Sequence, residues 1–497
     1  MKRSYPLRAF RMISLASSVV LMSCSVGPNF KKPVAPDTGS YSQKPLRNPE
    51  GTAGVRGGEA QRFVQDLDIP AQWWTLFHSR ALNTLVEDSL KANPNVKAAQ
   101  DALAVARENV AAQTGAYYPS VSAGLAASSQ TTSQSLSPVL NSSTFQFTLF
   151  TPEVLVSYSP DVFGLNRRTV ESLKALAEQQ HFLLEATDIT LSANVVTAAI
   201  QEASLRGQVA ATQEIIEINR KMVETLKKQV TTGYASQLPL AQQEAQLAQV
   251  VATLPPLMKQ LSQQRDLICV LAGKFPGQEP TATFTLSSLE LPRDLPVSLP
   301  SRLVEQRPDV RQAEENLHSA CALVGVAVAN RLPIFPLTGN LGSTATQISQ
   351  VFAPGNGFWT LAGAVTQPIF EGGTLLHKER AAREAYRQAN EQYRAVVLTA
   401  LQNVADTLHA LEQDAAALKA AQDAALAAKK TLDLTNRQVQ TGYANSLALL
   451  AAEQAYQQAE INLVQAQSNR FADTAALFQS LGGGWWNNEQ NPQKITR

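Results

Sequence analysis

The chain has 497 residues, of which 44% are hydrophobic, so it can build a substantial core. Its 42 Lys and Arg residues nearly balance its 41 Asp and Glu residues. The net charge of +1 excludes the basic surface typical of nucleic-acid-binding proteins. Beyond the N-terminus, no run approaches the ~20 consecutive apolar residues of a membrane-spanning helix. Three cysteines are too few for a disulfide scaffold, and we expect Cys269 and Cys321, both in apolar helical patterns, to be buried thiols.

The first residues have the pattern of an export signal, with four basic residues before a short, mostly apolar stretch at 12–22. The sequence LMSC follows and resembles the lipobox of bacterial lipoproteins. This resemblance implies that residues 1–23 are a signal peptide and that Cys24 is lipidated; an ordinary signal with a chance cysteine is the alternative. Ser25, in place of Asp, implies sorting to the outer membrane. Residues 24–72 are then an extended N-terminal segment rich in Pro, Gly and polar residues.

The remainder divides into two similar halves, at 73–272 and 301–481, separated by a Pro-rich linker at 273–300 and followed by a tail at 482–497. The stretches beginning NPNV and RPDV align without a gap and share apolar residues at alternating spacings of three and four. This spacing predicts one apolar stripe on a helix that opens each half and ends before a proline. The shared positions are Val96, Ala99, Leu103, Ala106 and Val110, matched by Val310, Ala313, Leu317, Ala320 and Val324.

Each half then changes to the alternating pattern of β-strands, which predicts hairpins at 119–160 and 334–370. The candidate strands are 119–132, 145–160, 334–347 and 358–370, and the second is the least regular because alternation breaks near Pro152. Their lengths suit the ~10 tilted residues of a transmembrane β-strand. Aromatic residues gather there, as in the interfacial girdles of membrane sheets, although the core of a soluble sandwich is the alternative. They are Phe145, Phe147, Phe150, Tyr158, Phe352, Phe358 and Trp359.

A very long helix is predicted next in each half, at 165–232 and 374–441, because these stretches contain almost no Gly or Pro. Apolar residues at four-three spacing indicate coiled-coil packing through narrow seams. In the second stretch they are Val397, Leu401, Val404, Leu408, Leu411, Ala415 and Leu418.

Each long helix runs into the sequence TGYA, which we interpret as the tip of a helical hairpin, at 231–237 and 440–446. Glycine can take the left-handed conformation that ends the first helix, and Ser236 or Asn445 can cap the returning one. The returning helix of the first half is expected to break at Pro255-Pro256. Tyr234 and Tyr443 either form a contact site or pack on their own hairpins. The tip residues are Thr232, Gly233, Tyr234, Ala235 and Ser236, with Thr441, Gly442, Tyr443, Ala444 and Asn445.

Four strands cannot close a membrane barrel, because the smallest barrels close with about eight. Either the sheet is soluble or several chains share one barrel.

The order of several motifs resembles TolC-type outer-membrane factors, and specifically the lipoprotein branch of OprM or NodT type. The resemblance covers almost the whole chain from Cys24 to Trp485. The motifs are CSVGPNFKKP, DIPAQWWTLFHSRALNTLVEDSLKANPNV, SPDVFG, LPSRLVEQRPDVRQAE, QPIFEGG, the two TGYA tips and SLGGGW.

This resemblance implies an α+β membrane protein with two structural repeats. In a homotrimer, four strands per chain would make a twelve-stranded outer-membrane barrel, and the helices would continue it as a coiled-coil barrel in the periplasm. The implied function is passive export of small toxic compounds. The implied partners are outer-membrane lipid, a periplasmic adaptor at the tips and an inner-membrane pump of RND type. The resemblance implies neither a cofactor nor a catalytic residue nor a metal.

The resemblance also places a gate just past the second tip, where the family has a hydrophobic residue and, one turn later, an aspartate. The matching positions are Leu447 and Ala451, so the acidic residue is missing. We expect a gate of Leu447 side chains with weaker attraction for cations.

Three other functions are alternatives. An enzyme finds little support, because none of the five histidines starts an H-E-x-x-H motif and no G-x-S-x-G or Walker A motif occurs. A structural coiled-coil lipoprotein does not explain strands that recur within the chain. The outer-membrane channel of a type I protein secretion system keeps the fold and changes the cargo.

Overall fold

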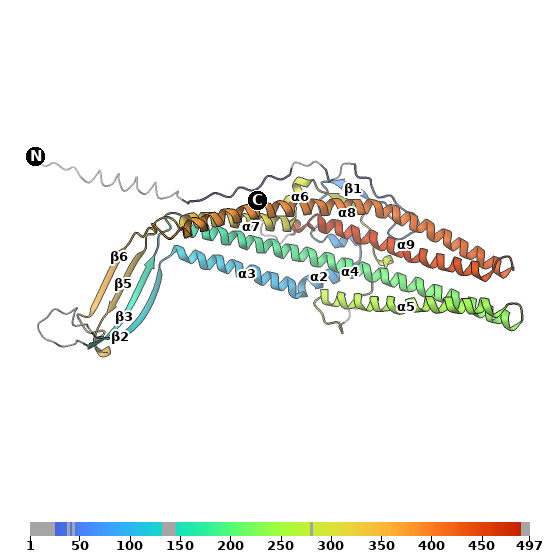
Figure 1. Cartoon of the computed structure of the whole chain (residues 1–497), viewed down its shortest axis with the longest axis horizontal. Helices are drawn as coiled ribbons and strands as arrows, with labels where there is room; N and C mark the ends of the chain where they lie inside the picture. Colours follow the sequence, from blue (N-terminus) through green and yellow to red (C-terminus); the bar gives the residue numbers. More distant parts are fainter. Residues whose placement is uncertain (1–24, 37–39, 42–44, 132–145, 279–281, 489–497) are drawn as a thin grey trace, which may run out of the picture. The chain divides into compact units, whose positions relative to one another are not determined.

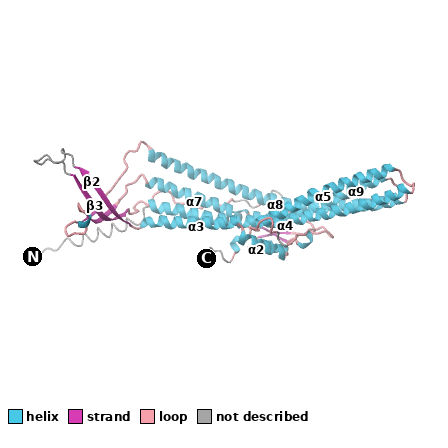
Figure 2. Cartoon of the chain, turned by 90° about the horizontal axis from the view of Figure 1, so that it is seen from below, coloured by secondary structure: helices cyan, strands magenta, loops and turns pink. Residues whose placement is uncertain are grey.

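The computed structural model describes residues 25–36, 40–41, 45–131, 146–278 and 282–488, and most of them are helical (Figure 2). The chain divides into two compact units. The first contains Met1–Lys32, Ala104–Gln179 and Ala313–Tyr393, and the second contains Pro33–Leu103, Gln180–Gln312 and Arg394–Arg497. The predicted signal peptide and Cys24 lie outside the described residues.

The first unit holds a sheet of four antiparallel strands that lie side by side in the order β2-β3-β5-β6 (Figure 1). All four expected strands are present. Pro152 lies inside β3, between the isolated bridge Phe150–Ala345 and the regular pairing with β5, which begins at Glu153. Its missing N–H accounts for this gap in the ladder between β3 and β5. The strands are β2 (Ser120–Thr131), β3 (Gln146–Tyr158), β5 (Leu337–Ser343) and β6 (Gly357–Gly363).

The last two strands are shorter than predicted. β5 begins only after Pro336, and β6 ends at Gly363, beyond which a single bridge joins Ile334 to Thr366. Proline lacks the N–H that a ladder needs, so Pro333 and Pro336 shorten the regular pairing on this side.

The helix that opens each half carries the predicted stripe, most completely in the second. In α7 (Pro308–Ala329), Val310, Leu317 and Val324 are all buried. In α3 (Pro94–Thr114), the buried positions are Val96 and Leu103. Both helices start at a proline, which is tolerated there because the first helical N–H has no partner within the helix.

Two long helical hairpins reach into the second unit. The helices α4 (Leu165–Thr231) and α5 (Gln237–Leu271) form one hairpin, and α8 (Thr374–Gln440) and α9 (Ser446–Ser480) form the other (Figure 1). The coiled-coil stripe of α8 is confirmed, since Val397, Val404, Leu408, Leu411, Ala415 and Leu418 are buried.

The expected break at Pro255-Pro256 is wrong, because α5 continues through both prolines. Their missing N–H groups leave the carbonyls of Val251 and Ala252, four residues earlier, without helical partners. Both of those residues are exposed, so water can bind the two carbonyls. The helix therefore loses two hydrogen bonds without burying an unsatisfied group.

The N-terminal segment and the linker, which were predicted as extended, together contain a small sheet. β1 (Arg62–Gln65) pairs in parallel with β4 (Asp294–Val297). The guanidinium of Arg62 holds the pKa of the Asp294 carboxyl below its usual range through a hydrogen bond. Each strand has only four residues, too few for a periodic pattern, and their pairing depends on contact across the sequence.

An aromatic core lies beside this small sheet in the second unit. Trp73 stacks on Phe478 with ring centroids 5.5 Å apart and meets Phe77 edge-on at 6.3 Å. The buried Arg470 of α9 donates to the carbonyls of Gly57 and Glu59, at 2.7 and 2.6 Å. These bonds attach the N-terminal segment to α9. The helices α2 (Arg80–Ala92) and α6 (Pro300–Gln306) complete the unit.

Among the described residues, α4 is the one helix with a stretch long and apolar enough to cross a membrane, judged by length and composition alone. Half of that stretch is buried within the chain, as in the core helix of a globular protein. Packing therefore accounts for its apolar composition.

Candidate functional site

The first hairpin tip ends its long helix in a Schellman motif. Gly233 has a φ of 81°, in the left-handed region that favours glycine. The amide of Tyr234 donates to the carbonyl of Gln229 at 2.8 Å, and the amide of Gly233 donates to that of Val230 at 3.1 Å. These two bonds satisfy carbonyls that the helix end would otherwise leave unpaired.

The second tip repeats this arrangement, because Gly442 has a φ of 79°. The amide of Tyr443 donates to the carbonyl of Gln438 at 2.8 Å, and the amide of Gly442 donates to that of Val439 at 3.2 Å. The prediction that glycine ends both long helices is confirmed.

The two returning helices begin differently. Asn445 caps α9 by accepting a hydrogen bond from the amide of Ala448 at 2.9 Å, as predicted. Ser236 occupies the equivalent position before α5, but its side chain makes no capping bond. The residue that matches Ala448 is Pro239, which has no N–H to donate. A proline therefore removes the partner that the predicted Ser236 cap requires.

Both tip tyrosines project into solvent. Tyr234 is 88% exposed and Tyr443 is 89% exposed, so neither packs on its own hairpin in this chain. Leu238 and Leu447, in the first turns of the returning helices, are also exposed. Each tip therefore presents one aromatic and one aliphatic side chain without a partner in the described part of the chain.

The two predicted gate residues lie on an exposed part of α9. Leu447 is 59% exposed and Ala451 is exposed as well, whereas Leu449 is buried. The first turn of α9 carries no acidic residue. The nearest carboxyl group along α9 belongs to Glu453, which is buried.

Glu453 belongs to a buried polar cluster that joins the two hairpins within the second unit. The side-chain amide of Gln243, on α5, donates to the Glu453 carboxylate at 2.9 Å and to the side-chain oxygen of Asn219, on α4, at 3.0 Å. Burial raises the pKa of the Glu453 carboxyl. Because buried polar groups are costly when unpaired, the cluster favours one alignment of α5 against α9.

The strand register sorts the side chains of the large sheet onto two faces. Residues opposite one another in an antiparallel pair share a face, which places Ala123, Val154, Leu341 and Trp359 in one row. Most of that face is apolar and exposed. Its apolar side chains are Val121, Ala123, Leu125, Ala127, Phe150, Val154, Val156, Tyr158, Leu337, Leu341, Trp359 and Leu361. The face becomes polar at one end, where Ser129 pairs with Thr148 and Thr131 pairs with Gln146.

The opposite face is mainly polar. One of its rows contains Ser122, Leu155, Asn340 and Thr360, and the next contains Ser120, Ser157, Thr338 and Ala362. Phe147 and Phe358 also lie on this face, so only part of the predicted aromatic set shares the apolar face. Phe145 lies outside the described residues. An apolar face opposite a polar one is the arrangement of a sheet between lipid and water.

Charged residues are almost absent from the sequence around these strands. Glu153 is the only Asp, Glu, Lys or Arg between Asn109 and Pro160, and there is none between Leu332 and Phe370. The whole chain contains 17% charged residues. This depletion was missed in the strand predictions, and it is the sequence signal that would have marked a membrane sheet, because charges facing lipid are costly.

The profile of the outer membrane efflux protein family matches residues 85–273 and 299–483. The chain belongs to this family. It is 26% identical to the toluene efflux pump outer membrane protein TtgC of Pseudomonas putida, with 96% of each chain covered. It is 27% identical to the outer membrane protein OprJ of Pseudomonas aeruginosa, again with 96% of each covered.

Solved structures have the same fold. The Campylobacter jejuni CmeC outer membrane channel superposes with a TM-score of 0.83 at 20% identity, covering 95% of this chain and 98% of that one. The open state of the Neisseria gonorrhoeae MtrE outer membrane channel superposes with a TM-score of 0.78 at 24% identity, covering 94% and 100%. The TolC-like fold of this outer membrane efflux protein is therefore confirmed.

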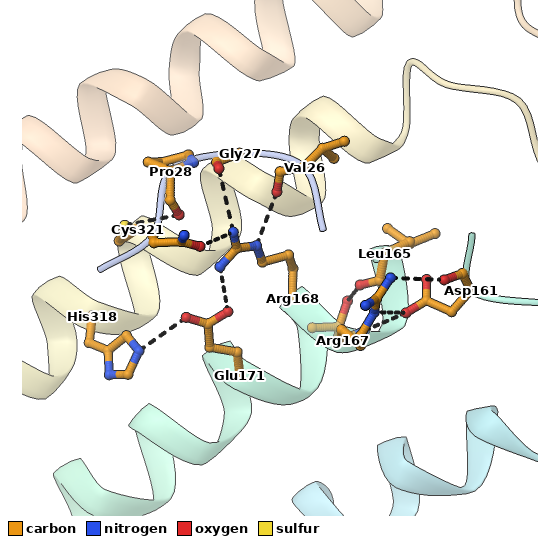
Figure 3. A network of polar contacts seen from close by, with 12 residues as sticks. Val26, Gly27, Pro28, Asp161, Leu165, Arg167, Arg168, Glu171, His318 and Cys321 are labelled. Atoms are coloured by element: carbon orange, nitrogen blue, oxygen red, sulfur yellow. Dashed lines mark hydrogen bonds and ion pairs between the residues drawn. The ribbon is translucent and has the colours of Figure 1, made fainter. Parts of the chain in front are cut away.

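In this efflux protein, the residues that follow the predicted lipidation site are attached to the first unit by Arg168 of α4 (Figure 3). Its guanidinium donates to the carbonyl of Val26 at 3.0 Å and to the side chain of Asn29 at 2.7 Å. It also forms an ion pair with Glu171 at 2.7 Å. Arg168 is only 3% exposed, so these partners replace the water that would otherwise solvate its guanidinium group.

Glycines allow the close approach of this segment. Gly27 has a φ of 90°, and a Cβ there would lie 2.4 Å from the Cα of Gly325 on α7. The ring of His318, which reaches Glu171 at 3.2 Å, stacks on Phe30 (Figure 3 shows the His318–Glu171 contact). Residues 26–30, which begin two residues after Cys24, are therefore held in place by contacts with α4 and α7. We call this set of contacts the seat of residues 26–30.

Besides Glu453, three carboxyl groups of the helices have raised pKa values. Burial raises the pKa of Glu185 to about 7, with a further contribution from Asp188, whose own pKa burial raises to about 6. Burial and a hydrogen bond with Asp473 raise the pKa of Asp414 to about 7. Glu185 and Asp188 lie on α4 and Asp414 lies on α8, all in the second unit.

In the described part of the chain, no three His, Cys, Asp or Glu side chains are placed to hold a metal ion. Cys269 and Cys321 are buried and form no disulfide bond, as predicted. Burial raises the pKa of the Cys321 thiol, which makes it less reactive.

Proposed function

We propose that three copies of this efflux protein form the outer-membrane exit duct of a tripartite efflux system. The observation that carries the proposal is the four-stranded sheet, which is mostly apolar on one face, mainly polar on the other and nearly free of charge. At its margins, β2 pairs only with β3 and β6 pairs only with β5 among the described strands. Such exposed edges are sites for pairing with another chain.

Joining β6 of one copy to β2 of the next closes a barrel of twelve strands from three copies. A single copy is too small to close, since a barrel needs about eight strands. The apolar face would then contact lipid and the polar face would line water. The two structural repeats, at 73–272 and 301–481, would each contribute one helical hairpin per copy to a tunnel in the periplasm.

The membrane anchor and the partners follow from the same arrangement. Lipidation of Cys24 would insert an acyl chain into the outer membrane, beside the seat of residues 26–30. The exposed tips around Tyr234 and Tyr443 would contact a periplasmic adaptor, and an inner-membrane pump of RND type would supply the energy. Leu447 would close the tip end. No chemical step is required of the duct.

Small-molecule cargo is favoured over a secreted polypeptide. Relatives that match at similar identity are named as a toluene efflux pump protein and, in the case of OpmQ of Pseudomonas putida, as a pyoverdine export protein. Pyoverdine and toluene differ greatly in polarity, so these names support export of small compounds without selecting one.

The decisive measurement is the mass of the detergent-extracted protein by light scattering, with the detergent contribution subtracted. Three chains per particle are expected. A folded monomer would contradict the shared barrel. In parallel, a strain that lacks its own channel and expresses this protein with its pump and adaptor should regain resistance to members of a panel of small toxic compounds that includes toluene. A trimer that restores resistance to none of them would contradict the efflux role but not the shared barrel.

A further inference from the structure

The only charged side chain of the four membrane strands is Glu153, and the register places it on the polar face of the sheet. It lies opposite Gly124 of β2 and Gly342 of β5, in the row next to Ser122, Leu155 and Asn340. Because the neighbouring strands carry no Lys, Arg or His, this carboxylate has no cationic partner in the sheet and is stabilised only where its face lines water.

Both neighbours of Glu153 in the sheet are glycines, so no side chain stands directly beside it. A Cβ built on Gly342 would lie 2.9 Å from the Cβ of Glu153 and 2.9 Å from the ring of Phe358, so a larger residue at 342 would displace one of them. A Cβ on Gly124 would have no atom within 4 Å. The sheet therefore leaves open space on the Gly124 side of Glu153, whereas Phe358 occupies the Gly342 side.

One hydrogen bond orients the side chain. The side-chain amide of Asn340, in the adjacent row of the same face, donates to Oε2 of Glu153 at 3.2 Å. A neutral donor positions the carboxylate without cancelling its charge. Glu153 thus combines a side chain oriented by a hydrogen bond, one open side and a negative charge with no cationic side chain on the neighbouring strands.

We propose that Glu153 makes the channel cation-selective within the membrane. The inference rests on the proposed trimer, in which the polar face lines the lumen and three-fold symmetry places three Glu153 carboxylates at one level. They would attract cations and repel anions of similar size. The selective charge would then lie in the barrel, while the tip position Ala451 carries none.

The test is the reversal potential of the full-length protein in planar bilayers under a KCl gradient. Each variant is measured alone and with Leu447→Ala, which widens the proposed gate. Glu153→Gln keeps the size and the hydrogen-bonding partner but removes the charge. We expect the K⁺/Cl⁻ permeability ratio to fall by about threefold or more near 0.1 M salt, where the Debye length is about 10 Å, and the difference to shrink near 1 M salt.

Matched variants separate charge from structure. Glu153→Asp should retain cation preference, and Asn340→Ala, which removes the hydrogen bond but not the charge, should retain most of it. Trimers of Glu153→Gln that conduct with the wild-type permeability ratio would overturn the inference and leave the proposed duct intact. Wild-type protein that neither forms trimers nor conducts would overturn the duct and this inference together.

Discussion

At the scale of single residues, the shared proton of Asp414 and Asp473 makes stability depend on pH. Burial and the hydrogen bond with Asp473 raise the pKa of Asp414 from 3.8 to about 7. Within that range the folded chain retains a proton that the unfolded chain has released. Folding therefore binds a proton, and stability falls as the pH rises from about 4 towards 7.

We expect Asp414→Asn to weaken this pH dependence, because the amide keeps a donor for Asp473 and cannot ionise. The measurement is the apparent Tm of the purified protein at pH 4.5 and pH 7.5, where the loss on raising the pH should be smaller in the variant. Asp423→Asn, at an exposed position of the same helix, is the control. Identical pH profiles for wild type and Asp414→Asn would contradict the prediction.

Arg168 supports a second prediction at this scale, because it attaches the segment after Cys24. Arg168→Leu removes the guanidinium hydrogen bonds to Val26 and Asn29, and losing two hydrogen bonds from a charged group costs about 3 kcal/mol. The amide of Val26, which donates to the carbonyl of Phe163 at 3.2 Å, should then exchange hydrogen about 100-fold faster. Arg107→Leu, at an exposed position of the same unit, should leave that exchange unchanged.

At the scale of elements, the hairpin tips separate folding from contact. Because Tyr234 and Tyr443 are almost fully exposed, replacing both with Ala should change the free energy of unfolding by less than about 0.5 kcal/mol. If the tips contact an adaptor, the same variant should lose most of its efflux in the complemented strain. Phe275→Ala, at another exposed aromatic, is the control. Full efflux by the tyrosine variant would argue against contact through these rings.

The helices show which predictions could be made from residues close together in the sequence. The four-three stripe of α8 and the glycines of the tips were predicted correctly, since both depend on residues within one or two turns. The predicted Ser236 cap failed because Pro239 cannot donate, a local rule that could have been applied from the sequence. The predicted break at Pro255-Pro256 failed because exposed carbonyls tolerate the missing donors.

At the scale of the whole molecule, two independent attachments to the membrane are expected. Cys24→Ser should abolish incorporation of labelled palmitate, because the thiol that accepts the acyl chain is absent. The variant should still resist extraction by alkaline carbonate, since the apolar face of the sheet holds it in the bilayer. Release of the variant into the soluble fraction would mean that the lipid alone anchors the protein.

The sequence by itself determined the elements that depend on near neighbours: the long helices, their glycine ends, the alternating strands and the buried thiols. It also held the depletion of charged residues around the strands, which supports the proposed position of the sheet in the membrane. Only the tertiary structure decided how β1 meets β4, how Arg168 seats the N-terminal segment, and which face of each strand is shared with its neighbours. Those features arise from contacts between residues far apart in the chain. Which of these contacts form depends on the strand register and on the burial of each side chain, and neither can be read from a local stretch of sequence. Glu153 illustrates the difference, because its charge is visible in the sequence but its place between Gly124 and Gly342 exists only in the folded sheet.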